Sequence, residues 1–161
     1  MTRYNQFLNR YFKFNKNSKG FYMNSYIKDE NNSKFIITNA FSMVRLNWNF
    51  NNKTLYKRFH DLELKEVENS YNQDSVLKMF ESFEKDGYCN SVELKNCDYM
   101  TYCIEGNEKK YTYNGYMIEN ILNLICKGKR KNYGVFVNDE KKAICITGEY
   151  GYAYLLPERV L

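Results

Sequence analysis

A chain of 161 residues with a net charge of +5, 43% hydrophobic and 17% aromatic residues has the size and composition of one globular domain. Its 5 cysteines, at positions 89, 97, 103, 126 and 145, include no C-x-x-C pair, and with a single histidine this argues against a zinc site. Because neither an apolar leader nor a run of about 20 apolar residues occurs, we expect a cytoplasmic protein with no membrane contact and with free, mostly buried thiols.

The charge is distributed unevenly along the chain. Residues 1–60 carry a net charge of +9, residues 61–126 carry −7, and residues 127–161 carry +3. A basic surface attracts phosphate, whereas an acidic one repels it, so nucleic-acid contacts are expected from the two ends of the chain. The alternative is a solvated surface of mixed charge.

The first expected element is an amphipathic helix over residues 2–14. Its apolar residues recur at helical spacing, and Thr2 is suited to cap its N-terminus. Arg3, Arg10 and Lys13 are expected on its polar side. The apolar positions are Tyr4, Phe7, Leu8, Tyr11 and Phe12.

The central part of the chain predicts several short strands and one short helix, at 74–84. Alternating apolar and polar residues bounded by turn residues indicate half-buried antiparallel strands. The expected strands are 21–27, 34–37, 43–48, part of 54–68, 91–94, 100–104 and 109–113.

A second long helix is expected to begin after Asn114 and to end before the basic run at 127–131. Lysine and glycine suit a helix C-terminus, and the apolar residues between positions 117 and 125 form one inner side. Three strands follow, at 133–137, 143–147 and 152–156. The order of elements predicts an α+β fold with two helices packed on antiparallel sheet, in one domain spanning 1–161, with a hint of two related halves at about 1–70 and 85–161.

We expect no catalytic activity and no cofactor. None of the nucleotide-binding, hydrolase or zinc-protease motifs occurs. His60 and Asp61 would supply a base and its orienting carboxylate, but no serine or cysteine is marked as their nucleophile.

The strongest candidate for a nucleic-acid contact is the run Lys127, Lys129, Arg130 and Lys131, followed by Tyr133. Lysine and arginine bind phosphate oxygens, and tyrosine stacks on bases or packs at the edge of the contact. The competing interpretation is a helix C-terminus whose cations are solvated.

Four segments resemble the bacterial DNA polymerase III β sliding clamp. Residues 113–122 are similar to the strand end and helix of the last clamp domain, 143–146 to the strand that follows, and 152–161 to its terminal strand. Residues 34–44 resemble a strand–turn–strand unit of the same family, with Ser42 in place of the family's arginine.

The resemblance implies a DNA-clamp-like (processivity-fold) domain that binds rather than catalyses, and we expect it to come from a phage or mobile element. Its partner would be DNA or a replication or defence protein. Six single-domain copies would be needed to close a clamp ring. In clamps the helices face DNA, so the implied phosphate contacts are Arg3, Arg10, Lys13, Lys127, Lys129, Arg130 and Lys131, with Tyr133 beside them.

The alternative is a stoichiometric inhibitor of a host defence enzyme that acts by protein–protein contact through the acidic middle or a tyrosine-rich patch.

Overall fold

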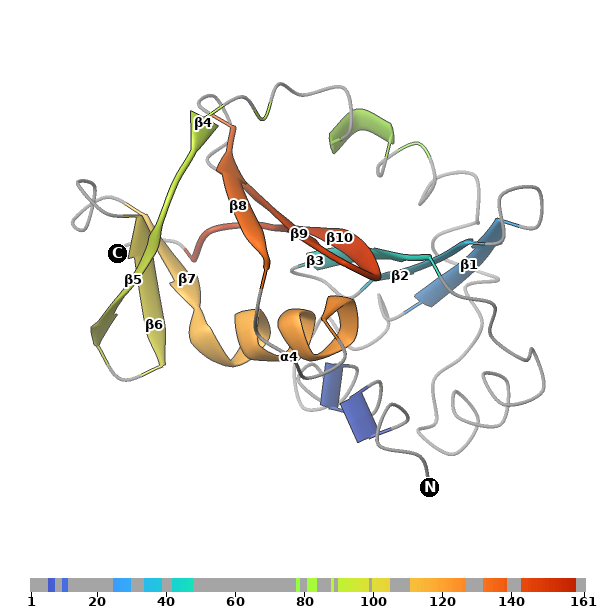
Figure 1. Cartoon of the computed structure of the whole chain (residues 1–161), viewed down its shortest axis with the longest axis horizontal. Helices are drawn as coiled ribbons and strands as arrows, with labels where there is room; N and C mark the ends of the chain where they lie inside the picture. The colour runs from blue at the N-terminus through green and yellow to red at the C-terminus, as the bar shows by residue number, and fades with distance from the viewer. Residues whose placement is uncertain are drawn as a thin grey trace.

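The computed structural model describes an α+β arrangement of antiparallel strands and helices (Figure 1). The α+β class predicted from the sequence is therefore confirmed. The described residues are 6–7, 10–11, 25–29, 34–38, 42–47, 78, 81–83, 88, 90–98, 100–104, 111–126, 132–138 and 143–158.

The larger sheet has seven strands, and its centre joins two distant parts of the chain. In it β3 (Ser42–Leu46) pairs with β10 (Gly151–Leu155), so that Val44 lies opposite Ala153. The strand order is β1-β2-β3-β10-β9-β8-β4, and each neighbouring pair is antiparallel. The remaining strands are β1 (Ser25–Asp29), β2 (Lys34–Thr38), β4 (Asn90–Ser91), β8 (Gly134–Val137) and β9 (Ile144–Gly148).

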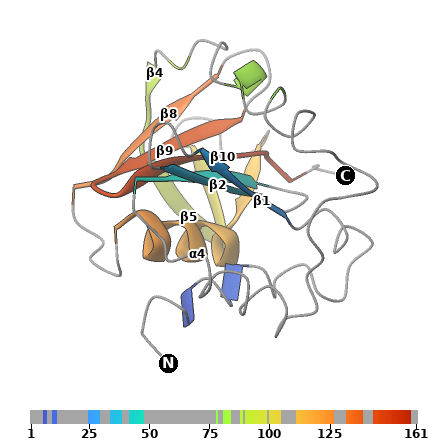
Figure 2. The same ribbon diagram turned by 90° about the vertical axis from the view of Figure 1, so that its right-hand side faces the viewer.

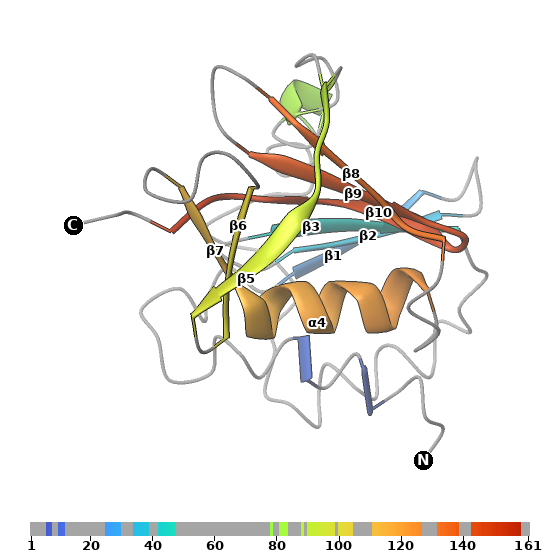
Figure 3. The same cartoon turned by 60° about the vertical axis from the view of Figure 1, so that its left-hand side comes forward.

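A smaller sheet of three strands lies beside the end of the larger one, in the order β5-β6-β7 (Figure 3). Its strands are β5 (Leu94–Asp98), β6 (Thr101–Ile104) and β7 (Thr112–Asn114). The chain passes from β4 in the larger sheet to β5 in the smaller one. The Val92 N–H donates to the Val135 carbonyl (2.9 Å), so the link between the two sheets stays bonded to β8.

Helix α4 (Gly115–Ile125) begins where the sequence predicts it. The Asn114 side chain accepts a hydrogen bond from the Met117 N–H (3.0 Å), which satisfies a backbone donor that the first helical turn leaves without a partner. Every apolar residue expected on the inner side of the helix is buried. These residues are Met117, Ile118, Ile121, Leu122, Leu124 and Ile125.

Side chains of the large sheet alternate between two cores, as the two-residue period of a strand requires. On β10, Ala153 and Leu155 face the main core with α4, whereas Tyr152 and Tyr154 belong to a second cluster. Figure 2 shows α4 below the sheet and the helical residues 81–83 above it. We call this second cluster the aromatic cluster; it comprises Ile36, Met43, Cys145 and Tyr154 with Phe83, Tyr88, Phe136 and Tyr152.

Most strand predictions in the described ranges are correct to within two residues. Strand β1 starts later than expected, at Ser25, and continues into the predicted turn at residue 29. Residues 78 and 81–83 of the expected helix at 74–84 are helical, while the strand expected within 54–68 lies outside the described residues. The confirmed strands are those expected at 34–37, 43–48, 100–104, 133–137, 143–147 and 152–156.

Strand β5 is the main error of the sequence interpretation, which placed a strand at 91–94 and none at 95–98. The side chains of Lys95, Asn96 and Cys97 are all exposed, so they give no apolar alternation to detect. The strand is held instead by its antiparallel pairing with β6.

The expectation of free thiols is also wrong for two of the five cysteines, because Cys97 and Cys103 are joined by a disulfide. The pairing of β5 with β6 brings their Cα atoms to 6.1 Å, a proximity that spacing along the chain does not reveal. Cys126 and Cys145 are buried thiols, as expected, and Cys89 lies outside the described residues.

Replacing Gly151 tests the junction between β3 and β10. Gly151 has φ of +156°, and a Cβ there would collide with the Arg45 carbonyl oxygen on β3. Gly151→Ala should therefore lower the free energy of unfolding by about 2–4 kcal/mol, measured by chemical denaturation. The control Ser91→Ala, on the exposed β4, should change it by less than about 0.5 kcal/mol. Equal stability of the two variants would contradict this packing.

Candidate nucleic-acid interface

Arg10 is an exposed cation in the described part of the N-terminal segment, which packs beside α4. Gln6, Phe7, Arg10 and Tyr11 are helical, in agreement with the predicted helix. Phe7 and Tyr11 are buried in the main core, whereas Arg10 is exposed, as the apolar periodicity predicts. In Figures 1 and 2 this segment lies below α4, on the side away from the aromatic cluster.

A buried polar contact fixes this segment to the large sheet. The Tyr11 hydroxyl lies 2.7 Å from the Ser42 hydroxyl and donates to the Ser42 carbonyl at 3.2 Å. The Ser42 hydroxyl also donates to the Met117 sulfur of α4 at 3.6 Å. Tyr11 and Met117 are fully buried, so three elements meet at one small polar site inside the core.

A second contact places Arg10 along α4. The Asn120 side-chain amide donates to the Arg10 carbonyl at 3.4 Å, and Asn120 itself is buried. Asn120 lies six residues before Cys126, the C-cap of α4, which corresponds to about 9 Å along a helix. The exposed Arg10 therefore lies beside the middle of α4.

The predicted cation set is described only in part. The cations Arg3, Lys13, Lys127, Lys129, Arg130 and Lys131 lie outside the described residues. Tyr133 is 42% exposed, just before β8, and follows Asn132, which has a positive φ of 61°. Within the described residues no hydrogen bond or ion pair joins Tyr133 to Arg10.

The C-terminal end of α4 is packed against the β9–β10 hairpin. The Tyr150 N–H donates to the Ile125 carbonyl at 2.9 Å, which satisfies one of the acceptors left at a helix end. The exposed Glu149 precedes Tyr150 and brings a carboxylate to this end. The pKa of the Cys126 thiol is raised, mainly because the thiol is buried. A hydrogen bond with the Glu149 backbone lowers this pKa, and the negative charge of the Glu149 side chain raises it.

Sequence reasoning did not identify the aromatic cluster on the other face of the sheet. Tyr154 stacks on Phe83 (ring centroids 5.7 Å apart) and packs against Tyr88 and Tyr152 at 5.2 and 5.9 Å. The Arg45 guanidinium donates to the Tyr152 hydroxyl at 3.1 Å. The alternation of β10 was visible in the sequence, but its pairing with β3, which brings Arg45 opposite Tyr152, was not.

The described residues contain no group of three or more His, Cys, Asp or Glu side chains suited to hold a metal ion. In the same residues, no helix is long and apolar enough to cross a membrane.

Comparison with known proteins gave no match: no family model, curated protein or solved structure matches the chain.

The polar contact between the N-terminal segment and β3 can be tested with Tyr11→Phe. The variant removes the hydroxyl that bonds Ser42, so the free energy of unfolding should fall by about 1 kcal/mol, measured by urea denaturation. Tyr116→Phe is the matched control, because Tyr116 is 42% exposed and its change should stay within about 0.5 kcal/mol. A Tyr11→Phe protein as stable as the control would show that this contact does not anchor the segment.

Proposed function

We propose that the chain is a non-catalytic binding protein with a sliding-clamp-like fold, which contacts DNA phosphates through the α4 side of the molecule. The proposal rests on the placement of the exposed Arg10 beside the middle of α4, where the Asn120 side-chain amide donates a hydrogen bond to the Arg10 carbonyl. The same helix leads directly into the basic run at 127–131. DNA would then contact Arg10 and this run together, although more than a hundred residues separate them in the sequence.

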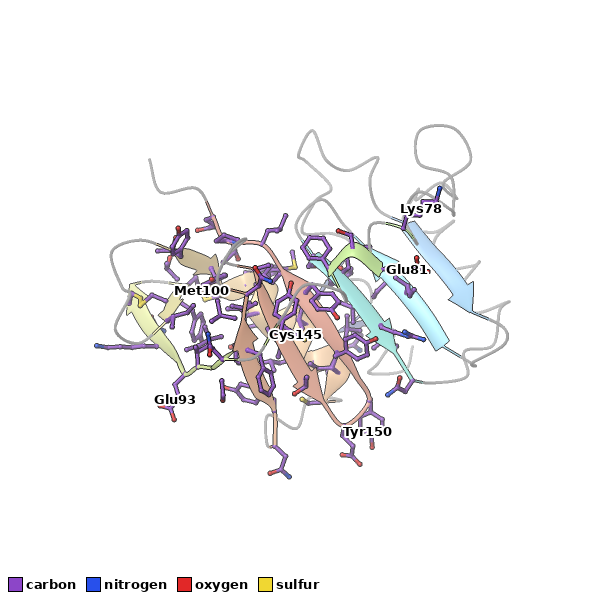
Figure 4. All side chains as sticks on the ribbon, turned by 90° about the horizontal axis from the view of Figure 1, so that it is seen from above. Lys78, Glu81, Glu93, Met100, Cys145 and Tyr150 are labelled. Carbon is purple, nitrogen blue, oxygen red and sulfur yellow. A yellow bond between two sulfur atoms is a disulfide. The ribbon has the colours of Figure 1, made fainter. Side chains whose placement is uncertain are left out.

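The fold supports the proposal in its coarse features. In sliding clamps two helices per domain lie on one face of antiparallel sheet and face DNA. Here α4 and the helical residues 6–7 and 10–11 share the main core on one side of the large sheet. The opposite side carries the aromatic cluster, with the exposed Lys78 and Glu81 on the helical segment above it (Figure 4).

Binding of this kind is mainly electrostatic and independent of base sequence. Lysine and arginine displace counterions from the duplex, so the logarithm of the affinity falls with the logarithm of salt by about 0.9 for each phosphate contact. Tyr133, exposed at the start of β8, is suited to pack against a sugar or base at the edge of the contact.

Removal of cations on the α4 side should weaken DNA binding. Arg10→Ala should lower the affinity for a short duplex about threefold to tenfold and reduce the salt slope by about 1, measured by fluorescence anisotropy at several salt concentrations. Replacing Lys127, Lys129, Arg130 and Lys131 together by Ala should reduce that slope by about 3 to 4.

The matched control for Arg10→Ala is Lys78→Ala. This variant also removes one exposed cation, but on the aromatic-cluster side of the sheet, and it should leave the affinity and the salt slope unchanged. A wild-type protein that does not bind duplex, or binds with no dependence on salt, would contradict the proposal. A protein partner for the same surface, as in a stoichiometric inhibitor, would then be the better account.

Removing the negative charge of Glu149 should raise the DNA affinity, the opposite of the effect expected from removing cations. Its carboxylate lies in the hairpin turn at the C-terminal end of α4, where it should repel an approaching phosphate. Glu149→Gln should therefore raise the DNA affinity about twofold to threefold at low salt, measured in the same titration. Unchanged affinity would place the DNA away from this end of the helix.

A further inference from the structure

The β5–β6 hairpin is closed by a disulfide at an irregular position of its ladder. Cys103 lies opposite Lys95, and the register shifts between Asn96 and Asp98. Cys97 is the residue at this shift, so its sulfur meets Cys103 diagonally across the two strands.

The two sulfur-bearing residues differ in their access to solvent. Cys97 is exposed on the outer strand of the three-stranded sheet, whereas Cys103 is fully buried. Thiol–disulfide exchange requires a thiolate to reach one sulfur of the bond, so attack from solvent is directed to Cys97. Disulfides exposed in this way are the ones that small thiols reduce most readily.

The hairpin also touches the start of α4. Met100, in the turn between β5 and β6, has φ of +51°, and its carbonyl accepts a hydrogen bond from the Gly115 N–H at 2.7 Å. A Cβ on Gly115 would lie 2.7 Å from that carbonyl oxygen and 2.9 Å from the Tyr102 ring. Figure 4 shows Met100 and Glu93 at this end of the molecule, away from Lys78 and Glu81.

We propose that Cys97 and Cys103 form a reversible redox pair, in which Cys97 exchanges with a small cellular thiol such as glutathione. In the reducing direction, a glutathione thiolate attacks the Cys97 sulfur and forms a mixed disulfide. The Cys97–Cys103 bond breaks, and the Cys103 thiolate takes up a proton. A second glutathione thiolate then attacks the glutathione sulfur of the mixed disulfide. This step releases glutathione disulfide and the Cys97 thiolate, which takes up the second proton. Two glutathione molecules thus supply two electrons and two protons.

Oxidation by glutathione disulfide is the reverse of these steps. It fixes the outer strand β5 to β6 and holds the Met100 turn against the N-terminus of α4. Reduction leaves the hairpin to its backbone hydrogen bonds, so local opening around Met100 and Gly115 becomes easier. This proposal does not depend on DNA binding.

Cys126 and Cys145 serve as internal controls in the same chain. They are only 3% and 7% exposed, and burial raises the pKa of the Cys126 thiol. Both properties suppress the reactivity of a thiol, because the thiolate is the nucleophile and must reach its target.

The direct test equilibrates the full native chain with glutathione buffers of increasing reduced-to-oxidised ratio. Exchange is then quenched with acid, the protein is unfolded, all free thiols are labelled with N-ethylmaleimide, and each cysteine peptide is quantified by mass spectrometry. Cys97 and Cys103 should become free thiols together, with one midpoint, whereas Cys126 and Cys145 should be free thiols without bound glutathione at every ratio. Amide exchange at Gly115 should be about tenfold faster in the reduced protein. A bond that glutathione never reduces, free thiols at Cys97 and Cys103 at every ratio, or unchanged exchange at Gly115 would overturn the proposal.

Two single variants test whether the Cys97 sulfur reacts with glutathione faster than the Cys103 sulfur. Cys103→Ser should accept glutathione on Cys97 at least about tenfold faster than Cys97→Ser accepts it on Cys103. Far-ultraviolet circular dichroism shows whether each variant is folded, and the titration of the wild-type chain remains decisive if one is not. Equal or reversed rates in folded variants would contradict the assignment of Cys97 as the reactive sulfur.

Discussion

The pairing of β3 with β10 is the constraint on which the rest of the fold depends. In the order of the large sheet, the pair β1 and β2 joins the strands β9, β8 and β4 through the contact between β3 and β10. Val44 opposite Ala153 closes the main core over α4, and Met43 opposite Tyr154 begins the aromatic cluster on the other face. One register between distant segments therefore determines both faces of the sheet, because a slip of one residue would exchange them.

Local features of the fold could be predicted because their signals lie within a few residues. Asn114 and the apolar spacing after it define α4, and the turn between Gly148 and Gly151 marks the last hairpin. The register of β3 on β10 could not be predicted, since many alternating strands satisfy the same pattern. The disulfide between Cys97 and Cys103 could not be predicted for a related reason, because it depends on the irregular pairing of a polar strand.

In the candidate interface, too, features that depend on neighbouring residues could be predicted, whereas contacts between distant segments could not. Helical spacing correctly divides Phe7 and Tyr11 from Arg10, so the exposed cation was visible in the sequence. What fixes that cation beside α4 is a pair of contacts across the fold, from Tyr11 to Ser42 and from Asn120 to the Arg10 carbonyl. Neither serine nor asparagine gives a sequence signal for such a role.

Hydrogen–deuterium exchange with and without a short duplex would show whether DNA lies against the α4 side of the molecule, as we propose. We expect slower exchange in peptides covering residues 6–13 and 122–133, with no change in residues 90–104. Protection confined to residues 78–104, or no change anywhere at a duplex concentration that saturates binding in the low-salt anisotropy titration, would contradict it.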